Sequence, residues 1–202
     1  MHIVCFDMEG VFTPEIWVNV AKKTGVDALK ITTRDEPDYD KLMRYRLGIL
    51  DQHGIGLRQI QEVIASLDLL PGAWDFFDRV RTRNQAIIVT DSFVEFAMPF
   101  IDKLGKPMVF CHNLITNGQG MITGYRLRQP DPKRCVVQAF QDLRYKVVGI
   151  GDSYNDISML QQAEKGILFR PPDSVVAEYP GFPVTRSYEE LQQRIDEAIA
   201  QL

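Results

Sequence analysis

The sequence has few of the features that mark nucleic-acid-binding, membrane or secreted proteins. Its 202 residues include no basic stripe, and the formal net charge is -4. Because clustered cations drive binding to nucleic acids and anionic lipid, we expect neither partner. The opening residues, MHIVCF, lack the basic start and long apolar run of a signal peptide or membrane span. We therefore expect a cytoplasmic protein that acts on a small molecule.

Cysteine is also scarce. The three cysteines, Cys5, Cys111 and Cys135, are odd in number, widely spaced and outside any C-x-x-C pair. This excludes a disulfide framework and gives no zinc-binding pattern. With 45% hydrophobic and 25% charged residues, the chain is an ordinary globular one, long enough for a core and a sizeable insertion.

Short apolar runs alternate with helical patterns over most of the chain. The predicted strands are residues 3–6, 86–90, 107–110, 146–150 and 166–169, and the predicted helices of this part are 73–82, 92–104, 132–143, 155–164 and 188–201. Residues 113–127 predict a β-hairpin with Asn117 and Gly118 at its turn. The alternation predicts an α/β fold, a doubly wound and mostly parallel sheet.

Residues 12–69 depart from this alternation and are largely helical by pattern. Thr13 is expected to cap a helix with Pro14 at its first position and Gly25 at its end. Two more helices are expected over 38–51 and 57–67. The sequence thus predicts a core domain of residues 1–11 and 70–202 and a small helical cap domain of residues 12–69.

Polar residues follow three of the predicted strands at the edge where such sheets bind ligands. Asp7 and Glu9 follow the first strand, Thr90, Asp91 and Ser92 follow the second, and the run GDSYND, residues 151–156, follows a third. Carboxylates gathered at one edge repel one another unless a cation lies among them. Oxygen ligands without His or Cys favour Mg²⁺, which in such sites usually serves a phosphate.

Lys133 lies in the first turn of a predicted helix that Asp131 caps and Pro132 opens. The helix dipole disfavours a cation there by about 0.3 to 1 kcal/mol. Two interpretations stay open from this feature alone: a lysine held to bind an anion, or a solvated surface lysine that tolerates the position.

D-M-E-G-V (residues 7–11), the strand end at Thr90, Lys133 and G-D-S-Y-N-D resemble the four ordered motifs of the haloacid dehalogenase-like phosphohydrolases. NDISML, residues 155–160, and the predicted cap are similar to those of the phosphoserine phosphatases. The second-motif sequence T-D-S-F resembles the subgroup that is both phosphoserine phosphatase and phosphoserine:homoserine phosphotransferase.

The resemblance implies a Mg²⁺-dependent reaction through an aspartyl-phosphate. It implies that Asp7 is the nucleophile, and that Glu9, where the family usually has aspartate, exchanges protons through its side chain while its backbone carbonyl binds the metal. Gly10 would let the backbone approach closely. The implied metal ligands are Asp7, Glu9, Asp152 and Asp156. For Asp156, a helix-start acid favoured by the dipole is the alternative.

The resemblance also implies how phosphate is held. Thr90 would donate its hydroxyl and Lys133 its charge, with Asp91, Ser92 and Asn155 also assigned to the phosphate site. Phosphoserine phosphatases typically have Ser-Gly-Gly at the second motif, so the role of Asp91 stays open.

Substrate recognition is expected from the cap. By the resemblance, Glu15 binds the ammonium of phosphoserine and Arg46 its carboxylate, with Tyr39 and Met43 as apolar walls. A first-turn helix acid is the alternative for Glu15, and a solvated helix face is the alternative for Arg46.

The acceptor and the substrate have alternatives as well. Because a pocket discriminates one methylene by only about 1 to 3 kcal/mol, homoserine is a candidate acceptor beside water. A sugar phosphate or nucleotide is an alternative substrate, and a phospho-acceptor signalling module is a non-enzymatic alternative. A homodimer is compatible with the sequence but not indicated by it.

Overall fold

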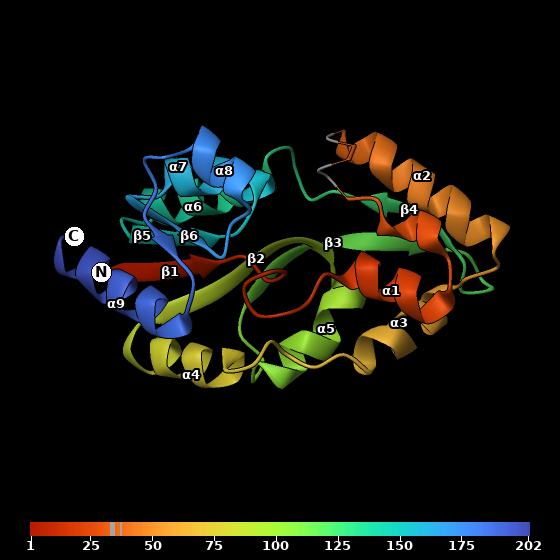
Figure 1. Cartoon of the computed structure of the whole chain (residues 1–202), viewed down its shortest axis with the longest axis horizontal. Helices are drawn as coiled ribbons and strands as arrows, with labels where there is room; N and C mark the ends of the chain where they lie inside the picture. Colours follow the sequence, from red (N-terminus) through yellow and green to blue (C-terminus); the bar gives the residue numbers. More distant parts are fainter. Residues whose placement is uncertain (33–34, 37) are drawn as a thin grey trace.

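In the computed structural model, which describes residues 1–32, 35–36 and 38–202, a seven-stranded sheet lies between two layers of helices (Figure 1). The strand order is β4-β3-β2-β1-β5-β6-β7, and every neighbouring pair is parallel except β3 and β4. The predicted doubly wound, mostly parallel α/β sheet is therefore confirmed. The strands are β1 (His2–Phe6), β2 (Gln85–Phe93), β3 (Val109–Thr116), β4 (Ile122–Arg126), β5 (Lys146–Gly151), β6 (Lys165–Phe169) and β7 (Val184–Thr185).

The helices cover both faces of this sheet. They are α1 (Ile16–Thr24), α2 (Tyr39–Gln52), α3 (Leu57–Ala65), α4 (Ala73–Arg83), α5 (Val94–Lys103), α6 (Pro132–Asp142), α7 (Ile157–Gln162), α8 (Asp173–Glu178) and α9 (Tyr188–Ala200), with 3-10 turns η1 (Asp27–Lys30) and η2 (Tyr154–Asp156). In Figure 1, α6, α7 and α8 lie on one side of the sheet and α4, α5 and α9 on the other. None of the described helices is both long enough and apolar enough to cross a bilayer.

The central strand β1 shows how burial on both faces is encoded. Ile3 and Cys5 pack into the core under α6, α7 and α8, whereas Val4 and Phe6 pack into the larger core under α4, α5 and α9. Successive side chains of a strand point to opposite faces, so a continuous apolar run suits a strand covered on both sides. This places β1 in the middle of the sheet, with its carboxyl end beside the site described below.

The helical insert, which we define as residues 12–69, follows β1 and carries α1, η1, α2 and α3. It lies at the end of the molecule where β3 and β4 form a hairpin (Figure 1). The Leu57 amide donates to the Gly120 carbonyl at 2.9 Å, and the Tyr125 hydroxyl donates to Asp40. The insert therefore rests on the hairpin as well as on the core, a contact between segments far apart in the sequence.

One local prediction was wrong and another was confirmed. Helix α1 begins at Ile16, and Thr13 is buried, with its hydroxyl donating to the Met8 carbonyl at 3.3 Å instead of capping a helix. The predicted hairpin is formed by β3 and β4 with Asn117 and Gly118 in its turn, which runs to Met121 and has Gly120 in the left-handed region. The Asn117 side chain accepts the amides of residues 119 and 121, which explains the longer turn.

Other boundaries also differ from expectation. Strand β2 extends to Phe93 and β3 to Thr116, beyond the predicted ends, while α8 and β7 were not predicted at all. Helix α2 and the helix end at Gly25, which is left-handed with φ 74°, agree with the sequence patterns.

Candidate active site

The carboxyl ends of β1, β2 and β5 meet at one edge of the sheet, where the strand order reverses. Strand β1 pairs with β2 on one side and β5 on the other, and the Asp7 amide continues this pairing by donating to the Ile150 carbonyl at 2.9 Å. A cavity of about 100 Å³ opens there. It is lined by Asp7, Glu9, Glu15, Trp17, Thr32, Tyr39, Arg46, Thr90, Asp91, Ser92, Phe93, Asp152, Ser153 and Asn155.

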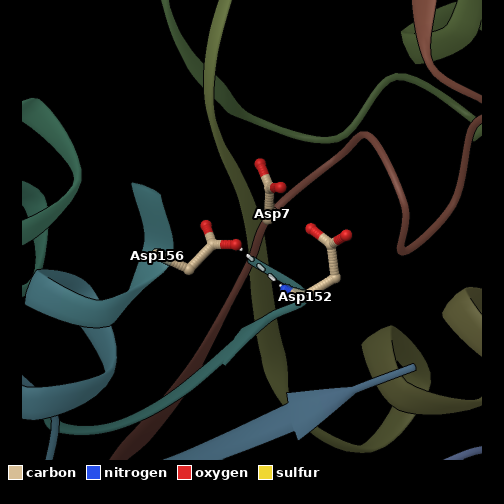
Figure 2. A group of neighbouring side chains, drawn as sticks. All are labelled: Asp7, Asp152 and Asp156. Carbon is tan, nitrogen blue, oxygen red and sulfur yellow. Dashed lines mark hydrogen bonds between the residues drawn. The ribbon is translucent and has the colours of Figure 1, made fainter. Parts of the chain in front are cut away.

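Three buried carboxylates form the floor of this site. One oxygen of each of Asp7, Asp152 and Asp156 lies within 4.8 Å of the others, and Figure 2 shows Asp7 coming from the end of β1 and the other two from the stretch after β5. Asp156 is fixed by its own turn, since its Oδ2 accepts the amides of Asp152 at 2.9 Å and Ser153 at 3.1 Å. Clustered carboxylate oxygens with this spacing suit a hard divalent cation such as Mg²⁺.

Glycine is required where the backbone approaches this floor. Gly10 has φ 77°, and a Cβ there would lie 2.5 Å from Asp152 Oδ2. At Gly151 a Cβ would lie 2.3 Å from the Cβ of Asp156. Both positions therefore need glycine for space, and Gly10 needs it for its left-handed conformation as well.

Lys133 lies in the first turn of α6 and is 1% exposed, so the interpretation as a solvated surface lysine was wrong. Its Nζ donates to Asp7 Oδ1 at 2.8 Å and to Asp156 Oδ1 at 2.6 Å. Asp131 occupies the predicted N-cap position but makes no capping hydrogen bond, and its Oδ1 instead accepts the Ser158 hydroxyl at 2.7 Å. Lys133 is thus tied to the acids on the floor.

The ammonium and the carboxylates of the floor shift one another's pKa values. Burial alone would lower the pKa of Lys133, but the carboxylates of Asp156, Asp7 and Asp91 raise it well above its usual value. Burial, followed by the charge of Asp156, raises the pKa of Asp7 well above its ordinary value, and Lys133 opposes this. A cation bound among the carboxylates would also favour the ionised form of Asp7.

Glu9 follows Asp7 by two residues, and its side chain points toward the helical insert. Its Oε2 accepts the amide of Ile16, the first residue of α1, at 2.9 Å. Burial, and then the charge of Glu15, raise the pKa of Glu9 to about 7. Within the described residues the clustered carboxylates do not include Glu9, so its side chain is available for proton exchange.

The second strand end supplies hydroxyls and a further acid. Thr90 and Ser92 are both buried, and the Ser92 amide donates to Thr90 Oγ1 at 3.2 Å. Asn155 donates its side-chain amide to Asp91 Oδ2 at 3.0 Å, while the Asp91 carbonyl accepts the Tyr39 hydroxyl at 3.1 Å. All of these residues line the cavity.

The opposite wall comes from the helical insert. Arg46 is 6% exposed, so it does not lie on a solvated helix face, and its guanidinium stacks 4.6 Å above the Trp17 ring. One of its amino groups donates to the Ile31 carbonyl at 2.8 Å, whereas its Nε has no hydrogen-bond partner among the described residues. Met43 packs against Arg46, with Sδ 3.8 Å from its other amino group.

The remaining predicted residues of this wall are accounted for differently. Glu15 lines the cavity from the exposed position before α1 and caps no helix amide through its side chain. Met43 is fully buried and is not among the described residues that line the cavity. Arg44 makes an exposed ion pair with Asp40 at 2.9 Å, as expected from their spacing.

Two residues that the sequence did not single out contact charged groups of the site. His112 is 2% exposed in β3, with Nε2 3.8 Å from Asp91 Oδ1. It lies two residues after the predicted strand end at residue 110, so the strand-end rule could have found it. Trp17 supports Arg46 from α1, and no pattern within that helix distinguishes it from a core residue.

Comparisons with known proteins agree with this geometry. The sequence profile of the haloacid dehalogenase-like hydrolases matches residues 1–164. The chain is 52% identical over 193 residues to phosphoserine phosphatase ThrH of Pseudomonas aeruginosa, covering 96% of this chain and 94% of that protein. It is 48% identical over 198 residues to a phosphoserine phosphatase of Pseudomonas syringae pv. tomato, covering 98% of this chain and 84% of that protein.

Solved structures share the fold at much lower sequence identity. A substrate-bound phosphoserine phosphatase complex has a TM-score of 0.79 and 18% identity, covering 96% of this chain and 97% of that chain. A phospho-aspartyl intermediate analogue of phosphoserine phosphatase has a TM-score of 0.78, also at 18% identity, with 96% and 98% covered. Matched in sequence over more than half its length and in fold over nearly all of it, the chain belongs to the haloacid dehalogenase-like hydrolases.

Proposed function

We propose that the protein is a Mg²⁺-dependent phosphatase that removes the phosphoryl group of O-phosphoserine through an aspartyl-phosphate on Asp7. The observation that carries the proposal is the fully buried ion-pair network in which Lys133 joins Asp7 to Asp156 beside a third carboxylate, Asp152. A buried cation and clustered acids at the end of a parallel strand meet the needs of phosphoryl transfer. The relatives named phosphoserine phosphatase support the choice of substrate.

Asp7 is the nucleophile of this mechanism. A carboxylate oxygen of Asp7 attacks phosphorus, the bond from phosphorus to the serine oxygen breaks, and the phosphoryl group is transferred to Asp7. Lys133, 2.8 Å from Asp7, and the Thr90 hydroxyl neutralise and orient the phosphoryl oxygens, with the amide of Asn155 nearby. Water then attacks phosphorus, and inorganic phosphate leaves as Asp7 is restored.

Glu9 moves the proton in both steps. Protonated Glu9 donates to the departing serine oxygen, and the resulting carboxylate then takes a proton from the attacking water. The pKa of about 7 that burial gives this group lets it hold and release a proton near neutral pH. The hydrogen bond from the Ile16 amide keeps its carboxylate oriented.

The donor set fits a magnesium ion. Asp7, Asp152 and Asp156 would hold it with the backbone carbonyl of Glu9, since buried carboxylates within 4.8 Å of one another repel strongly when all are ionised. When bound, the ion neutralises charge on the phosphoryl group and favours the ionised form of the nucleophile. The residue types and burial of the cluster support this assignment.

The helical insert would act as a separate cap domain that reads the amino-acid part of the substrate. Arg46 lines the cavity with a buried charge, and its Nε has no hydrogen-bond partner among the described residues, which suits a carboxylate. Glu15 lies on the same wall and suits the ammonium group. Tyr39 closes the wall through its hydrogen bond to the Asp91 carbonyl.

Homoserine is the proposed second acceptor of the phosphoryl group. It differs from serine by one methylene, which a pocket distinguishes by only about 1 to 3 kcal/mol. Its hydroxyl would attack the aspartyl-phosphate in place of water, with Glu9 taking the proton.

The test is a phosphate-release screen over phosphomonoesters with Mg²⁺, using the wild type and Asp7→Asn. We expect phosphoserine to be preferred and the variant to be inactive. Activity that survives Asp7→Asn would overturn the mechanism, and a preference for a sugar phosphate or nucleotide would overturn the substrate. Incubation of phosphoserine with homoserine should yield homoserine phosphate. Release of inorganic phosphate alone would overturn the proposal that homoserine is a second acceptor.

A further inference from the structure

Asp91 is a charged residue of the site to which the mechanism gives no chemical step. Its Oδ2 accepts the Asn155 amide at 3.0 Å and lies 3.5 Å from the Nζ of Lys133. Its Oδ1 lies 3.8 Å from Nε2 of His112. The four residues come from β2, β3, the first turn of α6 and the turn after β5, so Asp91 joins segments that are distant in the sequence.

Direct binding of phosphate does not account for this carboxylate. An ionised carboxylate repels a phosphate anion, and the Asp91 side chain is 25% exposed at the cavity wall. Burial would raise the pKa of Asp91, but the charge of Lys133, the nearby Nε2 of His112 and the hydrogen bond from Asn155 outweigh it and lower the pKa to about 2. The Asp91 carboxylate therefore stays ionised, and its charge acts on Lys133, His112 and Asn155.

His112 is oriented to support Asp91. Its ring is 2% exposed, and its Nδ1 accepts the backbone amide of Arg128 at 3.1 Å. Because Nδ1 accepts this bond, the proton of the ring lies on Nε2, the nitrogen that faces Asp91. The buried ring therefore places a donor behind the carboxylate.

Lys133 needs such a neighbour for geometric reasons. Two of its three N-H groups are directed to Asp7 and Asp156, both of which lie on the metal side of the site. Without a third partner, the ammonium could turn toward these acids and away from the phosphoryl group. Asp91, which lines the cavity, gives the ammonium a third partner at 3.5 Å and accepts the Asn155 amide, so it restrains both groups.

Resting on the proposed function, we propose that Asp91, supported by His112, is a positioning residue that holds the ammonium of Lys133 and the amide of Asn155 in place for phosphoryl transfer. It acts through these two groups and does not itself contact the phosphoryl oxygens. This gives a function to the aspartate that replaces glycine in the second motif.

The first test separates kcat from KM. In Asp91→Asn, which keeps shape but removes charge, we expect kcat for phosphoserine to fall about 10-fold because Lys133 and Asn155 lose their alignment. We expect KM to change by less than about threefold, since the lost alignment is offset by reduced repulsion of phosphate. Asp102→Asn, which removes an exposed carboxylate from the end of α5, is the matched control and should leave both constants unchanged. An unchanged kcat in Asp91→Asn, or a raised KM alone, would overturn the proposal.

The second test asks whether His112 acts through Asp91. His112→Phe should lower kcat about threefold to tenfold, and His112→Gln, which keeps a donor near the Nε2 position, should recover most of it. In the Asp91→Asn background, His112→Phe should have no further effect on kcat. Additive losses in this cycle would show that His112 acts independently and would overturn its assigned role.

A third measurement does not depend on turnover. Lys133 is held by carboxylates and 1% exposed, so its ammonium protons should exchange slowly and give an NMR signal that Lys133→Met removes. Asp91→Asn should shift this signal and speed its exchange, whereas Asp102→Asn should not; an unshifted signal would contradict the proposal. If the wild type fails to hydrolyse phosphoserine, the proposed function has failed, and this signal still decides whether Asp91 positions Lys133.

Discussion

The floor of the cavity and the wall formed by the helical insert differ in how their charged groups are partnered. On the floor, the ammonium of Lys133 is shared between Asp7 and Asp156, and both oxygens of Asp156 are occupied by donors. On the wall of the helical insert, the buried Arg46 keeps an Nε without a partner among the described residues, and Glu15 is exposed. Most charged groups of the floor therefore have partners, whereas the wall of the helical insert keeps an unpaired donor among its described residues.

This difference separates two tasks. The charged side chains of the floor already have fixed partners and are therefore preorganised, so they can stabilise charge in a transition state without moving. A buried donor without a partner costs about 1 to 3 kcal/mol, which a ligand carboxylate recovers on binding. The floor is thus suited to chemistry that is common to many phosphomonoesters, and the insert to the choice among them.

The largest effect is expected from breaking the floor at Gly10. Gly10→Ala forces a Cβ to within 2.5 Å of Asp152 Oδ2, so we expect hydrolysis to fall about 100-fold or more and Mg²⁺ binding by calorimetry to weaken. Gly25→Ala is the matched control, because Gly25 has a similar φ of 74° but nothing within 4 Å. It should cost about 1 to 2 kcal/mol of stability and spare activity. Equal losses of activity in both variants would refute the steric argument.

The insert wall is tested at Arg46. Arg46→Ala removes the proposed carboxylate ligand, so kcat/KM for phosphoserine should fall about 10- to 100-fold. Hydrolysis of p-nitrophenyl phosphate, which has no carboxylate, should change little, and this contrast distinguishes recognition from damage to the floor. Arg44→Ala, on the same helix but in an exposed ion pair, should retain the wild-type preference. A parallel loss on both substrates in Arg46→Ala would mean that the two walls are not separable.

Glu9 lies between the two walls and predicts a pH dependence of stability. Burial raises its pKa to about 7 from an ordinary 4.5, so in that interval the folded protein holds a proton that the unfolded chain has released. Stability of the metal-free protein should therefore fall as the pH rises through this interval. Glu9→Gln has no proton to lose and should flatten the fall by on the order of 1 to 3 kcal/mol.

Urea unfolding between about pH 5 and pH 8 measures this slope. Asp7, whose pKa is also raised, contributes a fall of the same sign in both proteins, so only the difference between them reports on Glu9. Glu62→Gln, an exposed acid paired with Arg58, should keep the wild-type slope. A Glu9→Gln slope identical to the wild type would contradict the assignment.

The smallest effect is expected at the contact between the walls. Tyr39→Phe removes the hydrogen bond to the Asp91 carbonyl, worth about 0.5 to 1.5 kcal/mol, so KM for phosphoserine should rise about 2- to 10-fold with little change in kcat. Tyr45→Phe on the same helix, with a side chain 45% exposed, is the control. A loss of kcat larger than the rise in KM would place the contact in the chemistry of the floor instead.

The floor of the cavity was easier to predict from the sequence than the wall of the helical insert. A rule about strand ends was enough to group Asp7, Thr90, Asp152 and Asp156. Each lies at or within a few residues of the end of a predicted apolar strand, and the carboxyl ends of parallel strands meet at one edge. The fold was accessible for the same reason, because continuous apolar runs such as that of β1 mark strands buried on both faces.

The insert wall and local details were less predictable. The stacking of Arg46 on Trp17 depends on how two helices cross, which periodicity does not specify. Thr13 resembles a helix cap in sequence, but burial directs its hydroxyl to the Met8 carbonyl. His112 lies just after the predicted end of its strand, but its approach to Asp91 depends on how β3 pairs with β2 past a register shift, which the sequence pattern does not specify.

The placement of β1 has a consequence for how the protein is made. β1 pairs with β2 and β5, and Asp7 meets Asp152 and Asp156, which are about 145 residues later in the chain. At about 5–20 residues per second of synthesis, Asp7 waits in the nascent chain on the order of 10 seconds for the acids that complete the cluster. The emerging chain therefore carries Asp7 long before it carries the proposed metal site, which is complete only when more than three quarters of the 202 residues have been synthesised.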